Sequence, residues 1–419
     1  MDPYIIAVCV LFALLGCLVG MITGLIPGIH VNTMASMALA MYPQISSSLS
    51  GALNQSLISM AICCSIMSAS VVHSFIDFVP SVFIGAPDGE DALSVLPGHR
   101  LLLKGKGMMA VRSAAIGSLI GCSAAILLAI PIQYLMFMGL ADDLDNYTKI
   151  VLLIVSGLIL SNEWKRRNIL FGTIAFLLSG CLGWMVMNLP IPATGVFEEG
   201  TLLMPMLTGL FGLPTMLTAS EGKPFPKQTD DKKDPVGVIP GLKGVVMGSV
   251  AGWFPGITST VGATISSTIM PDRSPERFIS TVASIGTVTS VLSLVTLSVS
   301  GGGRSGTVIV IGQILGDNIS GFATTPFVLM LVAAAIASLI GYFLTIGLGR
   351  SIAMLITKVN QRTMNRTVSV VLVIFTFILT GPWGLLILAI ATAIGFIPVS
   401  NDTGKTVLCS CLILPVLLM

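Results

Sequence analysis

No Asp, Glu, Lys or Arg occurs between Asp2 and Asp77, and this uncharged stretch limits the fold more than any other feature of the sequence. A helix that crosses the hydrocarbon core of a bilayer needs roughly 20 mostly apolar residues. Further uncharged runs cover 113–141, 168–197, 200–220, 244–271, 278–303, 318–349 and 367–401. The pattern predicts an all-α integral membrane protein with about ten to fourteen membrane segments.

The composition supports the same class. Only 10% of the 419 residues are charged, whereas a soluble domain carries about 25%. A water-facing surface cannot be built from so few charges, so the sequence excludes a soluble enzyme, a secreted domain and a nucleic-acid binder. The net charge of +2 says little about partners because it averages loops on two sides of a membrane.

Cysteines and the amino terminus suggest no metal or redox chemistry. The eight cysteines lie in apolar runs without the spacing of metal or disulfide motifs, so we expect small packing residues. Leu14–Cys17 resembles a lipoprotein cleavage box, but signal peptides begin with positive charge and the first charge here is Asp2. We therefore expect a retained first membrane segment, and no metal or cofactor apart from a coupling Na⁺ or H⁺.

Two motifs recur in the same order in the two halves of the chain. Gly20–Ile29 and Gly248–Ile257 share the pattern G-x3-G-x2-P-G-I, and Ala114–Gly121 matches Ala334–Gly341 at seven of eight positions. Such internal similarity indicates structural repeats. The one long hydrophilic stretch, Glu221–Lys243, lies between them. We predict repeats at 1–220 and 244–419, joined by a linker at 221–243.

Loop charges indicate that the repeats are inverted. In the first half an acidic loop (142–145) precedes a basic one (165–167), whereas in the second half a basic segment (350–366) precedes the uncharged turn 381–384. Cytoplasmic loops collect Lys and Arg, so equivalent loops are expected on opposite sides of the membrane, as in many secondary transporters. Both termini are then extracytoplasmic. The predicted cytoplasmic groups are Lys104, Lys106, Arg112, Lys165–Arg167, the linker, Arg350–Arg366 and Lys405.

Broken helices mark the candidate binding site. Pro27–Thr33 and Pro255–Thr260 interrupt apolar runs at equivalent places, and irregular backbone at membrane depth is tolerated where it lines a cavity or is buried in protein. A half-helix that begins after each break directs free N–H groups and a positive dipole end toward the cavity, which suits an anion. A proline kink used only for packing is the alternative.

A second Gly-rich interruption follows in each half, at 85–91 and 300–307. Arg304 is an isolated cation there, and its guanidinium beside glycine N–H groups could hold a carboxylate or phosphate; an interfacial loop arginine is the alternative. Asp77, Asp88, Glu90, Asp91 and Asp317 are the candidates for proton or sodium coupling, and Asp88 and Asp317 are the predicted ion-coupling residues. Loop residues or partners of Arg100 and Arg304 are the alternative. His73 is expected to be packed and hydrogen-bonded. The predicted substrate-binding residues are Pro27, Gly28, Ile29, His30, Asn32, Thr33, Pro255, Gly256, Ile257, Thr258, Ser259, Thr260 and Arg304.

The Gly24–Ile29 segment, the turn near Pro87 and the stretch from Pro97 to Gly121 together resemble the large membrane subunit of the tripartite tricarboxylate transporters, in its shorter archaeal branch. The resemblance implies a secondary transporter of organic anions such as citrate, helped in bacteria by a small membrane subunit and an extracytoplasmic binding protein. It also implies substrate contacts at both Pro-Gly segments. The family's Asp-Gly-Tyr-Pro turn reads Pro97–Arg100 here, without the acid.

These patterns predict a multi-pass protein of the plasma membrane that transports di- or tricarboxylates by cation symport. Alternating access would occur around a midplane site between the Pro-Gly loops, and we expect no catalytic residues, no nucleic-acid partner and contacts with membrane lipids or a second copy. The repeated Pro-Gly motifs are also similar to those of polyprenyl-phosphate translocases, which is the alternative function. A membrane enzyme or a passive channel is a third interpretation. The sequence shows no catalytic constellation, which disfavours the enzyme, and its isolated charges with broken helices disfavour a simple pore.

Overall fold

The computed structural model is mainly helical in the residues that it describes, with no strand among them. Seven of its helical stretches are long and apolar enough to cross a membrane, and one of them, Gly107–Lys165, contains two of the helices given below. The prediction of an all-α integral membrane protein is therefore confirmed. The described residues are 2–26, 31–84, 95–190, 192, 194–195, 202–218, 225–230, 236–254, 257, 259–272, 274–303, 305–358 and 360–418.

The long helices divide between the two halves of the chain. The first half contributes α1 (Pro3–Leu25), α4 (Gln55–Ile76), α7 (Gly107–Leu135), α8 (Ala141–Lys165) and α9 (Ile169–Asn188). The second contributes α14 (Pro275–Ser300), α16 (Thr325–Ile356) and α17 (Gln361–Ser400). The remaining elements are α2 (Val31–Ala40), α3 (Tyr42–Leu49), α5 (Phe78–Ile84), α6 (Val95–Leu103), η1 (Met136–Leu140), α10 (Leu203–Leu207), η2 (Thr208–Gly212), α11 (Leu213–Thr218), α12 (Ile239–Trp253), α13 (Ser259–Ile269), α15 (Gly306–Leu315), η3 (Gly316–Ile319), η4 (Lys405–Cys409) and α18 (Ser410–Leu418).

Two continuous helical stretches are kinked at a glycine. Residues 107–165 form 59 residues of helix, which at about 1.5 Å per residue would be far longer than a bilayer of about 30 Å if straight. The kink is at Gly139, whose φ of 111° is open to glycine. Gly381 (φ 69°) kinks α17 in the same way, directly before Pro382.

Glycines set how closely the first helix pair of each half packs. In the first half a Cβ at Gly24 would lie 3.0 Å from Ile76 Cβ, and Gly20 faces Val72 in the same way. In the second half Gly248 faces Val288 and Gly252 faces Leu292. The spacing is four residues on all four helices, so α1 packs on α4 with the register that α12 has on α14.

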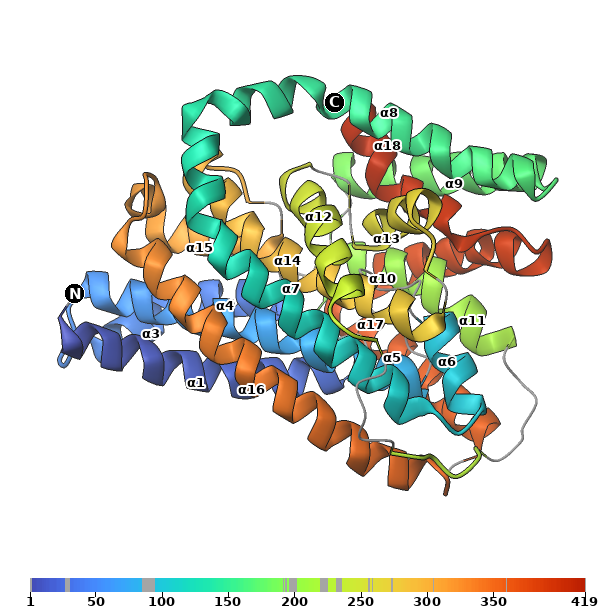
Figure 1. Ribbon diagram of the computed structural model, residues 1–419, viewed down its shortest axis with the longest axis horizontal. Helices are drawn as coiled ribbons and strands as arrows, with labels where there is room; N and C mark the ends of the chain where they lie inside the picture. The colour runs from blue at the N-terminus through green and yellow to red at the C-terminus, as the bar shows by residue number, and fades with distance from the viewer. Residues whose placement is uncertain are drawn as a thin grey trace.

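The two halves are packed crosswise, because α7 lies against α14 and α16 lies against α4. Thr287 Oγ1 donates to Ser118 O across the first contact, at 3.1 Å, and Ser68 Oγ donates to Ala333 O across the second, at 3.4 Å. Helices α7 and α16, which carry the matching Ala114 and Ala334 motifs, also touch and run in opposite directions (Figure 1). The core is thus shared between the halves.

Large apolar side chains cover much of the outer surface. Leu127 is 78% exposed, and Met138 and Phe343 are each 70% exposed. Monomeric soluble proteins rarely expose contiguous apolar surface on this scale. The exposed side chains on α7, α8, α9, α16 and α17 therefore form the surface that faces lipid, as the scarcity of charge predicted.

Candidate functional site

The first Pro-Gly segment separates two helices. Helix α1 ends at Leu25, Ile26 is extended (φ −98°, ψ 105°), and α2 begins at Val31. The predicted residues Pro27, Gly28, Ile29 and His30 lie outside the described residues, and so does the Thr33 side chain. The interruption expected from the sequence is therefore present, with Asn32 in the first turn of the second helix.

The second segment repeats this arrangement. Helix α12 ends at Trp253, Phe254 is extended (φ −80°, ψ 122°), and α13 begins at Ser259. Ile257 and Ser259 are both buried, at 4% and 1% exposure. Pro255, Gly256 and Thr258, together with the Thr260 side chain, lie outside the described residues.

Asn32 joins the first break to the second half. Its Oδ1 accepts a hydrogen bond from Thr307 N, 3.0 Å away, in the first turn of α15. A Cβ at Gly306 would lie 2.8 Å from Asn32 Cγ, so this approach requires glycine. Ser305 caps the same helix by accepting from Val308 N. The structure thus brings the first Pro-Gly segment beside the Gly-rich interruption of the second half, which the sequence could not show.

Of the charged candidates Arg304, Asp88 and Asp317, the structure describes only Asp317, and it lies away from this contact. Arg304 and Asp88 lie outside the described residues. Asp317 is exposed in η3, beyond the carboxyl end of α15. Because ten residues of helix span about 15 Å, Asp317 and the Asn32 contact lie at opposite ends of that helix.

His73 is packed and hydrogen-bonded, as expected. Only 3% exposed, it places Nδ1 3.0 Å from Thr23 Oγ1 on α1. Thr23 in turn donates to Gly20 O, one helical turn earlier. Asp77, the residue after α4, is 8% exposed. The sequence placed His73 in an apolar run but gave no sign that it would contact the end of α1.

The linker binds both halves through one carboxylate. Asp230 pairs with Arg112 on α7 at 2.6 Å and with Arg350 on α16 at 2.8 Å. Burial raises the pKa of Asp230, but the hydrogen bonds and charges of the two arginines outweigh this and hold the pKa below its usual value. The beginning of α7 and the end of α16 therefore lie on the same side of the molecule.

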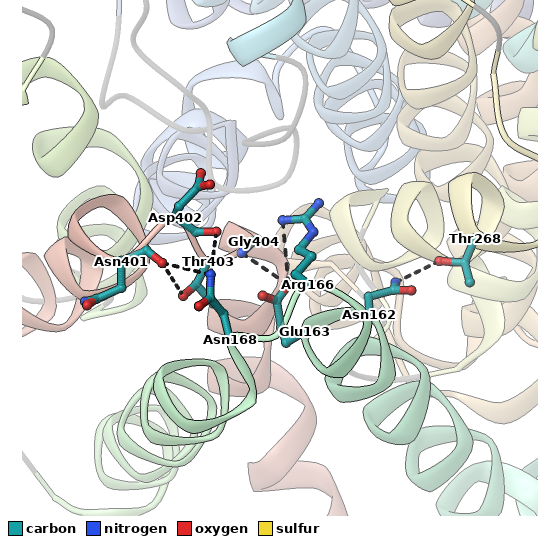
Figure 2. Close-up of polar contacts among 9 residues, drawn as sticks. All are labelled: Asn162, Glu163, Arg166, Asn168, Thr268, Asn401, Asp402, Thr403 and Gly404. Atoms are coloured by element: carbon teal, nitrogen blue, oxygen red, sulfur yellow. Dashed lines mark hydrogen bonds and ion pairs between the residues drawn. The ribbon is translucent and has the colours of Figure 1, made fainter.

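A polar cluster that the sequence analysis missed joins the end of α8 to the start of η4 (Figure 2). Glu163 is 1% exposed, and its Oε1 accepts from Gly404 N at 3.2 Å and lies 3.8 Å from Arg166. Asn168 Nδ2 donates to Asn401 O at 3.0 Å. Glu163 directly follows a long apolar run, and this position could have indicated a buried acid. The neighbouring basic residues instead suggested a solvated loop.

Lys405, the first residue of η4, is a second cation at this end of the molecule. Its Nζ donates to Thr215 Oγ1 on α11. Burial lowers the pKa of Lys405 to about 8. Its neighbour Gly404 is held by Glu163, so the predicted cytoplasmic groups Lys165–Arg167 and Lys405 are close in space.

A buried ion pair holds the far end of α13. Lys243 Nζ lies 3.0 Å from Asp272 Oδ1, with side-chain exposures of 9% and 8%. Thr281 Oγ1 donates to the other carboxylate oxygen at 3.2 Å, and Lys243 also bonds Met270 O. The half-helix after the second break is thereby fastened to α12 and α14.

Nothing in the described part of the chain resembles a metal centre. No group of three or more His, Cys, Asp or Glu side chains is placed to hold an ion there. All eight cysteines are free, seven of them buried and Cys181 exposed. The short polar groups near the breaks can instead offer hydrogen bonds to an anionic ligand.

Comparison with known proteins gives one family. Residues 10–409 match the model of the tripartite tricarboxylate transporter TctA family. An uncharacterized protein of Methanocaldococcus jannaschii, MJ1079, is 28% identical over 356 residues, covering 83% of this chain and 86% of that protein. No solved structure matches the chain.

Proposed function

Because the chain belongs to the TctA family of tripartite tricarboxylate transporters, we propose that it is a secondary active transporter of small organic anions, namely di- or tricarboxylates. The observation that carries the proposal is the pair of matching helix breaks, each with an extended residue before it and a new helix after it. Free N–H groups at the start of α2 and α13 would bind carboxylate oxygens.

The substrate site lies between the two Pro-Gly segments in this proposal. The short polar residues Asn32, Ser259 and their neighbours complement the N–H groups, and Arg304 supplies a positive charge. Asn32 supports this placement because its contact with Thr307 brings the loop that precedes α15 to the first break. Asp88 remains a proposed coupling residue, and Asp317 is a weaker one because it is exposed and distant.

Two inverted repeats would allow alternating access. This proposal is supported by the equal register of the α1/α4 and α12/α14 pairs and by the opposite directions of α7 and α16 (Figure 1). In transporters built in this way one repeat moves against the other around a fixed midplane site. The crosswise packing of α7 and α14 supplies the interface along which such movement would occur.

We place the linker and the ends of α7 and α16 in the cytoplasm, with both chain termini outside the plasma membrane. The contact of Asp230 with Arg112 and Arg350 supports one shared basic side, and cytoplasmic loops are enriched in Lys and Arg. A membrane-impermeant maleimide added outside intact cells should modify Asp143→Cys but not Lys227→Cys, both in a cysteine-free background. Labelling of Lys227→Cys alone would reverse the orientation.

The family also suggests partners. A small membrane subunit and an extracytoplasmic binding protein belong to tripartite systems, and we propose that a cation gradient, Na⁺ or H⁺, drives uptake. Co-purification of the chain from its native membrane would identify a small subunit if one is required.

The decisive experiment is counterflow in proteoliposomes. Vesicles loaded with unlabelled citrate, malate or succinate should take up the labelled acid, and empty vesicles should not. Asn32→Ala should weaken uptake because it removes the acceptor for Thr307 N, whereas Gln44→Ala, on the same half of the chain, is the control. Absence of counterflow for every di- and tricarboxylate, together with flipping of a polyprenyl phosphate, would favour the lipid substrate instead.

A further inference from the structure

Two ionisable side chains lie inside a membrane segment next to the first break. His73 and Asp77 are 3% and 8% exposed and are one helical turn apart at the end of α4, within the apolar stretch Gln55–Ile84. Ionisable residues at such depth are costly, and they mark ion or proton pathways in pumps and transporters. Packing alone does not explain why a histidine and an aspartate occupy these positions.

His73 is hydrogen-bonded to a residue of α1. Its Nδ1 lies 3.0 Å from Thr23 Oγ1, and the Thr23 hydroxyl also bonds Gly20 O, 3.2 Å away. The imidazole becomes charged when a second proton binds the ring nitrogen that the neutral form leaves unprotonated.

This hydrogen bond reaches the end of α1. Thr23 lies three residues before Ile26, the extended residue at which the helix stops. A Cβ at Gly24 would lie 3.2 Å from His73 O, so the backbone of α1 and the His73 turn are in contact. A change in the charge of His73 therefore acts on the segment that enters the first Pro-Gly break.

The second half has neutral residues at the matching positions. The register that pairs Gly20 with Val72 and Gly248 with Val288 makes Thr289 the counterpart of His73 and Ser293 the counterpart of Asp77. Thr289 Oγ1 lies 3.5 Å from Gly248 O, the carbonyl that corresponds to Gly20 O. In the second half Thr289 bonds this carbonyl directly, whereas in the first half Thr23 bonds it and His73, which can be protonated, bonds Thr23.

Within the part of the chain that the structure describes, the helices packed on α4 carry few charges. Helices α2, α5 and α15 pack on α4 and contain no acid or base within their bounds. On α7 and α16 the cations Arg112 and Arg350 are bound by Asp230. The other titratable groups on elements that pack against α4 are Tyr4, Cys9 and Cys17 on α1, Tyr42 on α3, Cys122 and Tyr134 on α7, Glu276 and Arg277 on α14, and Tyr342 on α16.

We propose that His73 and Asp77 form the proton-binding site that couples transport to a proton gradient. This inference rests on the proposed function. One proton from the outside binds the neutral imidazole of His73, with Asp77 as the balancing carboxylate, and leaves to the cytoplasm after the anion. The Thr23 hydrogen bond links the charge of the ring to the end of α1, so proton binding and the shape of the break change together.

The test separates anion exchange from proton coupling. Purified protein in proteoliposomes is assayed for citrate counterflow without a gradient and for citrate accumulation driven by an acidic exterior. Wild-type protein is expected to show both. His73→Gln and Asp77→Asn should still exchange citrate but lose the accumulation driven by the pH gradient. Thr289→Val, at the matching position of the second half, and His99→Gln, a half-buried histidine on α6, should retain both activities.

Several results would overturn the proposal. If His73→Gln accumulates citrate as well as wild type does, His73 is not part of the coupling site. If wild-type accumulation is driven only by a Na⁺ gradient, proton coupling is excluded while the transporter function stands. If the wild-type protein shows no counterflow, both the transporter function and the coupling site are excluded. If His73→Gln does not fold, Thr23→Val decides: it keeps the ring but removes the hydroxyl that bonds Nδ1, so the pH at half-maximal accumulation should shift, and an unchanged value counts against the site.

Discussion

At the scale of single residues, the charges that lie at depth are the informative ones. Glu163, Lys243 and Asp272 are all nearly fully enclosed, and each fastens one end of a helix to its neighbours. Burying a charge is costly unless it is paired and hydrogen-bonded. These residues therefore mark places where helices are joined by specific polar contacts rather than by apolar packing alone.

Breaking the Lys243–Asp272 pair should destabilise the protein more when one partner is removed than when both are. Lys243→Met or Asp272→Leu leaves one buried charge without its counter-ion, at a cost of roughly 3–5 kcal/mol. The double variant removes both charges and should recover much of that loss. Thermal unfolding in detergent of the two single variants and the double variant measures the coupling; additive losses would mean that the pair is not an energetic unit.

A second prediction at the scale of single residues concerns Glu163. Glu163→Ala leaves Gly404 N without its acceptor and should lower the free energy of unfolding by about 1–3 kcal/mol. Glu163→Gln keeps an acceptor oxygen and removes a buried charge, so it should be close to wild type. Asp143→Ala, an exposed acid at the start of α8, is the control in the same thermal unfolding assay. Equal losses for Glu163→Gln and Glu163→Ala would show that the charge itself is required.

At the scale of helices, the close packing depends on glycines with no room for a side chain. At Gly248 a Cβ would lie 2.6 Å from Val288 Cβ, and at Gly121 it would lie 2.5 Å from Ser284 Oγ. Small residues at helix interfaces in membranes let the backbones approach, which supplies the contacts that hold such helices together.

Gly248→Ala and Gly121→Ala should each lower stability by about 1–3 kcal/mol, because neither helix can move without disturbing its other neighbours. Gly157→Ala on α8 and Gly347→Ala on α16 have open space at the same point and should be neutral or slightly stabilising. The measurement is the midpoint of thermal unfolding for all four variants. A loss of the same size in the control variants would remove the explanation by close packing.

Many features of the individual helices can be predicted from the sequence. The helical membrane class, the helix breaks predicted within Pro27–Thr33 and Pro255–Thr260 and the turn near Gly381 follow from apolar length and from Pro and Gly, which act locally. The new helices begin inside the predicted ranges, at Val31 and Ser259. Which helices touch could not be predicted, because the crosswise contacts of α7 with α14 and of α4 with α16 join residues that are more than 150 positions apart. For the same reason the Asn32 contact with Thr307 and the His73 contact with Thr23 came only from the structure.

At the scale of the whole molecule, the linker carboxylate contacts both halves at once. Asp230 binds one arginine from each, and it is about one-third exposed, with a side-chain exposure of 31%. A pair so exposed contributes modestly at any one pH. Its structural role is to hold the beginning of α7 beside the end of α16.

The contribution of Asp230 should depend on pH in a defined direction. Its pKa is lowered in the folded protein, so the stabilisation is fully present above the ordinary carboxyl pKa of about 4 and is lost as the pH falls through the lowered value. Wild type should therefore be more stable than Asp230→Asn at pH 6, and the difference should shrink in acid. Thermal unfolding across pH 3–7, with Asp143→Asn as control, measures it; a difference that stays constant would contradict this origin.

The crosswise packing of the halves has a consequence for biosynthesis. Helix α7 leaves the ribosome about 170 residues before its partner α14, which at 5–20 residues per second is roughly 8–35 s of synthesis. During that interval the glycine-lined face of α7 has entered the bilayer without the surface it is shaped to fit. Neither half completes its own core, so the newly made first half must be held by lipid, by the insertion machinery or by a second nascent chain until the other half arrives.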